Sequence, residues 1–243
     1  MTPTENFISH LIELRNRLLR MVIGFVLAFF ALFPFANKIY ALLAAPLLSK
    51  LPEGGQMIAT AVTTPFFVPM KVAMMTAFIV SLPHTMYQAW TFVSPGLYAH
   101  EKKFMLPIIV ASCALFLMGM AFAYYLVFPV VFGFVVGTAP MGVAVMTDIG
   151  NYLDFVLTLF FAFGLAFQVP IAVVMMVRFG WVTVAQLKEA RGYVVVAAFV
   201  IGAIFTPPDI ISQFMLAVPM WLLYELGVLV ASFNQKAPPT IHQ

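Results

Sequence analysis

The chain has 243 residues, of which 63% are hydrophobic and only 9% are charged, with a formal net charge of +3. A typical soluble domain carries about 25% charged residues, so this composition cannot supply a polar shell over a core of this size. It excludes a soluble enzyme, a nucleic-acid-binding domain and a disordered chain, and it predicts a polytopic membrane protein. The single cysteine, Cys113, excludes an intrachain disulfide and is expected to be a small buried residue.

Six apolar segments are candidate membrane spans, since about 20 apolar residues cross a hydrocarbon core of about 30 Å. In chain order they cover residues 18–36, 66–92, 104–132, 153–177, 193–205 and 210–233. Each is expected to be helical, because a backbone in hydrocarbon must satisfy its own hydrogen bonds. The predicted fold class is an all-α integral membrane protein with six transmembrane helices in one domain, residues 1–233, and a short cytoplasmic tail, residues 234–243. Charges that precede the first span argue against a cleavable signal peptide.

The last two segments are expected to be short. The fifth rises only about 20 Å as a helix, and Thr206-Pro207-Pro208-Asp209 forces a turn after it. Segments five and six are therefore either two short spans, which would thin the bilayer locally, or one re-entrant hairpin. Prolines inside the segments predict kinks, and so a bent, concave array of helices. These prolines are Pro69, Pro83, Pro107, Pro129, Pro170 and Pro219.

The basic residues predict the orientation. With a cytoplasmic N-terminus, nine of the 12 Lys and Arg residues fall on the inner side, and only Lys38, Lys50 and Lys71 fall outside. The positive-inside rule then places both termini in the cytoplasm. In the long outer loop, residues 37–65, the apolar middle is expected to lie on the membrane surface. In the second outer loop, Gly133 and Gly137 suit either helix packing or loop flexibility.

Catalytic, metal-binding and phosphate-binding motifs are missing from the sequence, so we expect no enzyme activity and no cofactor. Two carboxylates remain at the predicted inner face. Glu13 can pair with Arg17 four residues later on a helix, and Glu101 can be neutralised by Lys102 and Lys103. Alternatively, both acids lie on one cytoplasmic face, where each could accept a guanidinium in a bidentate pair.

A second group of polar residues lies at or near membrane depth. Gln168 suits either a helix–helix hydrogen bond or a functional contact, and Glu225 is the one clearly deep acid. Asp148 and Asp154, at the start of the fourth span, are expected to cap that helix and to stabilise its dipole. Asp209 is expected to be a turn residue and N-cap of the sixth span.

Four stretches of the chain, taken together, resemble the signature stretches of the TatC family, the multispanning subunit of the twin-arginine protein translocase. They occur in order and at matching spacing, and the resemblance extends from about Phe7 to Phe233. The stretches are His10-Leu-Ile-Glu-Leu-Arg15, Ser94-Pro-Gly-Leu-Tyr-Ala-His-Glu101, Gly119-Met-Ala-Phe-Ala-Tyr124 and Thr206-Pro-Pro-Asp209.

The resemblance implies a function that composition alone does not. Proteins of this family bind the twin-arginine signal peptides of folded precursors. With TatB-like and TatA-like single-span partners in an oligomeric complex, they export these precursors across the bacterial cytoplasmic (inner) membrane. Transport uses the protonmotive force without nucleotide hydrolysis.

The resemblance also implies roles for individual residues. Gln168 stands where many members have a glutamate, which puts a proton-carrying role there in doubt, and Ala99 stands where some have a basic residue. The implied signal-peptide-binding residues are Glu13, Arg15, Phe92, Glu101, Lys102 and Lys103. Gln168 and Glu225, selected above for their depth, remain the candidate intramembrane or partner-contact residues. The implied outer-face motif residues are Pro46, Tyr124, Pro207, Pro208 and Asp209.

Two other classes of function remain open from the sequence. A secondary transporter or channel for a small solute would use Gln168 and Glu225 as its intramembrane polar site. An intramembrane enzyme would need a second deep catalytic group besides Glu225. The scarcity of charge inside the spans favours a receptor that recruits other subunits.

Overall fold

The computed structural model describes residues 3–48, 57–93, 102–137, 146–205 and 210–234, with only the backbone described at 3–8, 46–47, 93, 102–105, 135–136 and 234. Within these ranges the regular structure is helical, apart from one isolated β-bridge between Ile58 and Asp148. The prediction of an all-helical chain is confirmed for this part of the protein.

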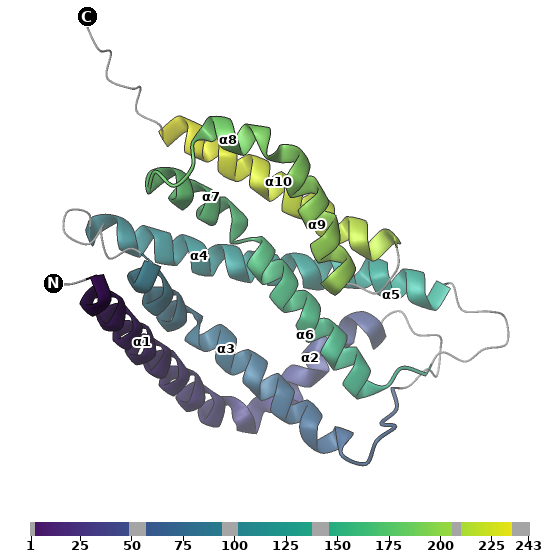
Figure 1. The fold of residues 1–243 in the computed structure, drawn as a ribbon. Coiled ribbons are helices and arrows are strands. Elements are labelled where there is room, and N and C mark those ends of the chain that lie inside the picture. Colours follow the sequence, from purple (N-terminus) through teal and green to yellow (C-terminus); the bar gives the residue numbers. More distant parts are fainter. Residues whose placement is uncertain (1–2, 49–56, 94–101, 138–145, 206–209, 235–243) are drawn as a thin grey trace, which may run out of the picture. The chain divides into compact units, whose positions relative to one another are not determined.

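Ten α-helices follow one another along the described chain (Figure 1). A 3-10 turn at Phe33–Phe35 separates the first two, and a π-helical turn at Ala123–Val127 separates the fourth from the fifth. The helices are α1 Pro3–Leu32, α2 Ala36–Leu48, α3 Thr64–Val93, α4 Lys102–Phe122, α5 Phe128–Gly137, α6 Ile149–Ala166, α7 Val169–Arg178, α8 Val184–Glu189, α9 Arg191–Phe205 and α10 Ile210–Asn234.

Five helical stretches of the described chain are long and apolar enough to cross a membrane: Ser9–Ala45, Thr64–Phe92, Leu106–Phe134, Ile149–Arg178 and Ile210–Phe233. The fifth predicted segment forms the 15-residue helix α9, which falls below that length. The expectation that the sixth segment is also short is wrong. α10 continues through Pro219 for 25 residues, long enough to span the hydrocarbon core.

Of the six prolines expected to cause kinks, two lie at helix irregularities, and a further proline, Pro34, lies in the 3-10 turn between α1 and α2. Pro129 follows the π-helical turn, and Pro170 follows a break at Phe167–Gln168 that separates α6 from α7. A proline lacks the N–H donor and crowds the preceding turn, and both irregularities relieve that conflict. The other prolines lie inside continuous helices, namely α3, α4 and α10.

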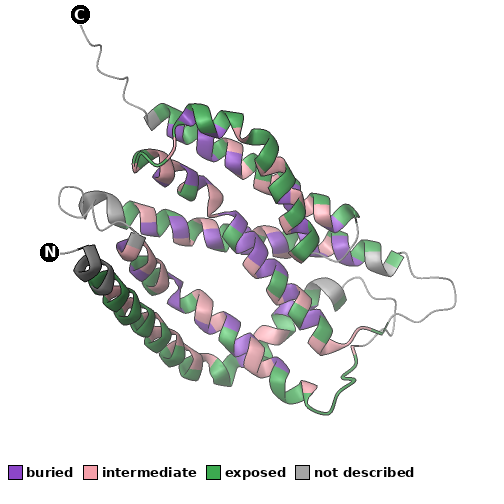
Figure 2. Ribbon diagram, viewed as in Figure 1, coloured by how far each residue is buried: buried purple, intermediate pink, exposed green. Residues whose placement is uncertain are grey.

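The chain forms two compact units, residues 1–117 with 132–157 and residues 118–131 with 158–243. In the first unit α1 packs along α3, yet none of residues 9–35 is buried, as the green and pink colours of α1 in Figure 2 show. The buried residues of this unit lie mainly on α3, α4 and the start of α6, and include Val72, Leu82, Phe116 and Leu153.

A close contact fixes α1 against α3. A Cβ added to Gly24 would lie only 3.0 Å from Cδ2 of His84, so the absence of a side chain there makes room for the imidazole ring. The His84 Nε2 atom lies 3.1 Å from the Arg20 carbonyl oxygen. The contact places the middle of α1 beside the C-terminal half of α3.

At the other end of the first unit, Asp148 joins two connecting segments. Its Oδ1 accepts hydrogen bonds from the amides of Gly150 and Asn151, which is the helix-capping role expected for it. Its Oδ2 accepts from the Thr60 amide at 2.8 Å and the Thr60 hydroxyl at 2.7 Å. Nearby, the buried Tyr152 hydroxyl donates to the Leu43 carbonyl at 2.6 Å and ties α2 to α6.

Asp154 does not cap α6, contrary to the sequence prediction. It is the sixth residue of the helix, beyond the first turn with its free amides, and it forms an ion pair with Lys71 of α3 instead. Gly133 and Gly137 do not mark close helix packing either. A Cβ added at either position meets nothing within 4 Å, and α5 extends through both, so the predicted outer loop begins later than expected.

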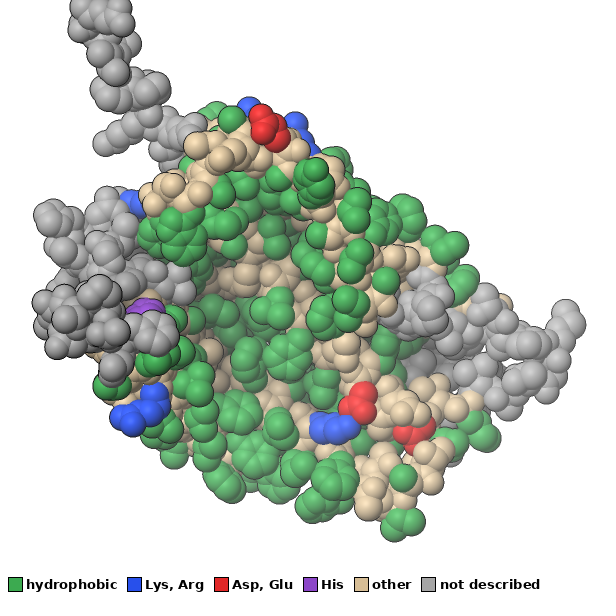
Figure 3. All heavy atoms as spheres, in the orientation of Figure 1, with side chains coloured by type: hydrophobic (Ala, Val, Ile, Leu, Met, Phe, Trp, Pro, Cys, Tyr) green, Lys and Arg blue, Asp and Glu red, His purple; other side chains and the backbone are tan. Residues whose placement is uncertain are grey.

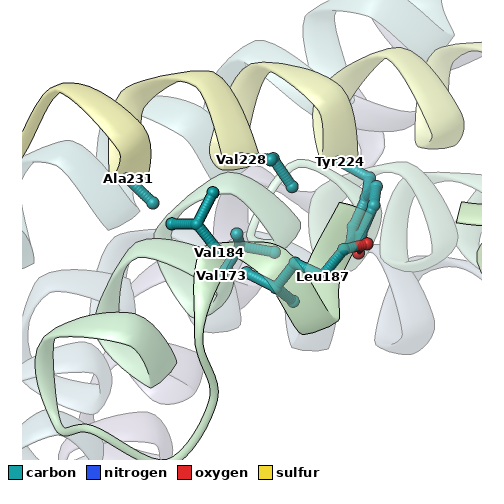
Figure 4. Close-up of a cluster of buried hydrophobic side chains, with 6 residues drawn as sticks. All are labelled: Val173, Val184, Leu187, Tyr224, Val228 and Ala231. Atoms are coloured by element: carbon teal, nitrogen blue, oxygen red, sulfur yellow. Dashed lines mark hydrogen bonds between the residues drawn. The ribbon is translucent and has the colours of Figure 1, made fainter. Parts of the chain in front are cut away.

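The second unit packs α7, α8 and α10 around one apolar cluster, drawn in Figure 4: Val173, Val184, Leu187, Tyr224, Val228 and Ala231. Gly227 allows α10 to approach α7 closely, because a Cβ there would lie 2.8 Å from the Pro170 Cα. α9 and α10 form a hairpin in which Gly202 contacts Gln213, whose amide donates to the Phe199 carbonyl at 3.0 Å. The short helix α9 is therefore held to the full-length helix that follows it.

Candidate functional site

Glu13 lies on the first turns of α1, where its carboxylate already holds a guanidinium. Arg17 donates from Nε to Glu13 Oε1 at 2.9 Å, and its Nη2 donates to the same oxygen. The other oxygen, Oε2, lies 4.0 Å from His10 Nδ1, and the Glu13 side chain is 38% exposed. The predicted pairing with Arg17 is thus present, and both of its hydrogen bonds go to Oε1 rather than Oε2.

His10 links this carboxylate to the end of α3. Its ring stacks on Phe92, with centroids 4.5 Å apart and the rings inclined by 16°. Helices α1 and α3 run antiparallel, so the start of one meets the end of the other. The stacking brings two predicted binding residues, Glu13 and Phe92, into one cluster.

The other predicted binding residues do not all join this cluster. Arg15 is exposed and donates to the Asn16 side chain at 3.2 Å, since two residues of helix turn it about 200° away from Glu13. Glu101 lies outside the described residues, and Lys102 and Lys103 begin α4 with only their backbone described. The meeting of Glu13 and Glu101 on one face therefore stays a prediction.

Gln88 is a residue of this region that sequence reasoning did not select as a site. It lies one turn before Phe92 on α3, is only 4% exposed, and its Oε1 has no hydrogen-bond partner among the described residues. An unsatisfied buried carbonyl costs about 1–3 kcal/mol. The sequence does place a glutamine inside a predicted span, and a polar side chain there is energetically costly, which could have marked Gln88 as a candidate.

Other polar side chains make the interior near Gln88 more polar than an apolar span requires. The buried Ser112 hydroxyl of α4 accepts from the Trp90 indole at 2.9 Å, and the buried Thr91 hydroxyl donates to the Tyr87 carbonyl at 2.6 Å. The end of the first unit that contains Phe92 thus combines a half-buried carboxylate, a stacked aromatic pair and a polar interior.

The intramembrane residues of the second unit have local structural partners. Glu225 Oε2 accepts from Arg191 Nη2 at 2.6 Å, while the neighbouring Tyr224 hydroxyl donates to the Leu187 carbonyl at 2.6 Å. Gln168 is half-buried at the break between α6 and α7, where its backbone carbonyl accepts from the Ala172 amide at 3.0 Å. Glu225 is thus a paired carboxylate rather than an isolated charge.

The outer-face motif residues are only partly described. Tyr124 lies in the π-helical turn, with its ring 5.0 Å from that of Tyr125. Pro46 belongs to α2 with its backbone alone described, and Pro207, Pro208 and Asp209 lie outside the described residues. In the first unit, the hydrogen bonds from Asn151 and Thr60 hold the pKa of Asp148 down at about 2.

Comparison with known proteins identifies the fold and the family. A family profile described as Sec-independent protein translocase protein (TatC) matches residues 9–219. The chain belongs to the TatC family. It is 55% identical over 221 residues to the Sec-independent protein translocase protein TatC of Azotobacter chroococcum mcd 1, covering 91% of this chain and 87% of that protein. The corresponding protein of Haemophilus influenzae is 53% identical over 232 residues, with 96% of this chain and 91% of the relative covered.

A solved structure gives the same result in three dimensions. The crystal structure of the twin-arginine translocase receptor TatC superposes on this chain with a TM-score of 0.82 at 37% identity, covering 92% of this chain and 98% of that chain. Several membrane-length apolar helices on a TatC fold make the chain a multi-pass membrane protein of the translocase class. The sequence left open a solute transporter and an intramembrane enzyme. The relatives of this chain belong to neither class, since they are protein translocase subunits.

Proposed function

We propose that this chain is the twin-arginine translocase subunit that binds the signal peptides of folded precursors at the end of the first unit formed by Glu13, His10 and Phe92. The observation that carries the proposal is the Glu13 carboxylate, which already holds the Arg17 guanidinium on a TatC fold. A group that binds one guanidinium has the acceptor chemistry for another.

The geometry supports different partners for the two oxygens of the Glu13 carboxylate. Arg17 uses Oε1 for both of its hydrogen bonds, so an arginine of the peptide would be received at Oε2. The stacked His10 and Phe92 rings offer an apolar surface beside this oxygen, suited to the stem of an arginine or to the apolar stretch of a signal peptide. Glu101 would supply the second carboxylate, for the second arginine.

The rest of the transport function follows from family membership. We place the chain in the bacterial inner membrane as a single domain of six spans, with α9 as the short fifth span or as half of a re-entrant hairpin, and with both termini in the cytoplasm. Single-span partners of the TatA and TatB kind would complete an oligomeric translocase driven by the protonmotive force. The basic-residue asymmetry supports this orientation, because it puts Glu13 on the side from which precursors arrive.

Binding of a synthetic peptide to the full chain in lipid nanodiscs tests the proposal. We expect a twin-arginine signal peptide to bind at least about tenfold more tightly than its twin-lysine analogue, since a guanidinium can donate two N–H groups to Oε2, as Arg17 does to Oε1, and an ammonium lacks this planar fork. Glu13→Gln should remove most of that difference. Glu189→Gln, an exposed acid on α8, is the matched control and should preserve it. Equal affinity for both peptides in the native chain would contradict the assignment.

A further inference from the structure

Lys71 and Asp154 form an ion pair that the proposed peptide site does not use. Lys71 donates to Asp154 Oδ1, from α3 to α6, within the first unit. The pair lies about 30 Å along the α3 axis from Phe92, so it belongs to the other end of the helix. Both side chains remain accessible, with 36% of Lys71 and 56% of Asp154 exposed.

The depth of the pair can be estimated from the two helices that carry it. Lys71 is the eighth residue of α3 and Asp154 the sixth of α6, which places them about 8–10 Å below the helix starts. The polar contact between Asp148 and Thr60 marks those starts. Because the head-group layer is about 5–7 Å thick on each side, the pair lies where lipid head groups meet the acyl chains.

The surroundings of the pair are those of a lipid-facing surface. Phe67 and Met74, which share a face of α3 with Lys71, are exposed hydrophobic residues, and Phe66 is more exposed still. Figure 3 shows how rarely charged side chains interrupt the hydrophobic surface on the side in view. A charge in such a position is costly unless a further partner solvates it.

Lys71 still has hydrogen-bonding capacity to offer that partner. Its ammonium has three N–H donors, and Asp154 is its one partner among the described residues. The two remaining donors suit a phosphate. The exposed carboxylate beside them suits an ammonium group that lies a few ångströms from that phosphate.

We propose that Lys71 and Asp154 bind the head group of a zwitterionic phospholipid that carries a primary ammonium, as phosphatidylethanolamine does. The lipid phosphate accepts hydrogen bonds from Lys71, and the lipid ammonium donates to Asp154. A choline head group cannot replace it fully, because its quaternary nitrogen has no N–H to donate. An anionic glycerol head group meets the Asp154 charge without an ammonium to neutralise it.

Native mass spectrometry of the full chain, released from detergent micelles that contain one lipid at a time, tests the proposal. The chain should retain phosphatidylethanolamine about fivefold more than phosphatidylcholine or phosphatidylglycerol. Lys71→Gln should abolish this preference. The control Lys188→Gln, an exposed lysine on α8, should leave it intact.

Asp154→Asn separates a lipid site from a merely structural ion pair. It removes the negative charge that attracts the ammonium but keeps the phosphate donor on Lys71, so the preference should move from phosphatidylethanolamine toward phosphatidylglycerol. The double charge swap K71D/D154K should restore the original preference, because the lipid phosphate can then bind the lysine at position 154 and the lipid ammonium the aspartate at position 71. Equal retention of all three lipids by the native chain, or no change in Asp154→Asn, would overturn the proposal. The assay uses no peptide, so its result is independent of the peptide-binding function.

Discussion

Asp148 shows how one residue can organise a connection between distant segments. Its carboxylate accepts four hydrogen bonds, two on each oxygen, and joins the segment before α3 to the first turn of α6. Its role as a cap was predictable because an aspartate preceding an apolar helix is a common N-cap. Its bond to Thr60, 88 residues away, was not, because it depends on tertiary structure.

The lowered pKa of Asp148 gives this contact a defined pH dependence. The pKa falls from 3.8 to about 2 on folding, so the unfolded chain binds more protons between these values. The stabilisation is therefore complete above about pH 4 and is lost as the pH falls toward 2. We expect Asp148→Asn to lower the melting temperature of the detergent-solubilised chain at pH 6, and the difference from the native chain to shrink near pH 2.5. A difference that is the same at both pH values would contradict this account.

Three features at the scale of elements could be predicted from sequence. The helical character of all six segments follows from their apolar length. The short α9 follows from the prolines that close its segment. The cluster of Glu13, Arg17 and His10 follows from helical spacing alone.

Features that join different elements were beyond prediction from one sequence. The break between α6 and α7 occurs at Gln168, two residues before Pro170. The sequence alone does not show why the helix breaks near this proline when α3 and α10 continue through theirs. The pairing of Lys71 with Asp154, and of Arg191 with Glu225, depends on which helices become neighbours. For the same reason the sequence marked Gln88 only as a polar residue inside a predicted span, and its burial with an unsatisfied side-chain carbonyl among the described residues depends on tertiary structure.

Contact between α7 and α10 in the second unit depends on a missing side chain. A Cβ at position 227 would lie 2.8 Å from the Pro170 Cα and 3.1 Å from the Val173 Cβ, and the first of these is backbone that cannot move aside easily. Gly227→Ala should therefore destabilise the chain by about 1–3 kcal/mol, the usual cost of overpacking.

Gly192→Ala is the matched control for this substitution. A Cβ at position 192 of α9 meets nothing within 4 Å, and alanine is the better helix former. Chemical unfolding in mixed micelles would measure both variants. A Gly227→Ala chain as stable as Gly192→Ala would mean that α7 and α10 do not approach as closely as described.

At the scale of the whole molecule, the two units have different proposed roles. The first carries the Glu13 cluster at one end of α3 and the Lys71–Asp154 pair near the other, so peptide recognition and lipid binding share one helix. The second carries the apolar cluster of α7, α8 and α10, with Glu225 neutralised by Arg191. This distribution suits a receptor that provides a binding face and leaves the transport path to an assembly.

We propose that Glu13 and Glu101 together receive the two arginines of a signal peptide. The most direct measurement is photo-cross-linking of a twin-arginine peptide to the full chain, with the photoreactive residue placed at Ala99, two positions before Glu101. We expect a cross-link that an unlabelled twin-arginine peptide displaces, that a twin-lysine peptide does not displace, and that Glu13→Gln removes. A probe at the exposed Trp181 of the second unit should give none. An equal yield from Trp181, or a yield at Ala99 that Glu13→Gln leaves unchanged, would contradict the account.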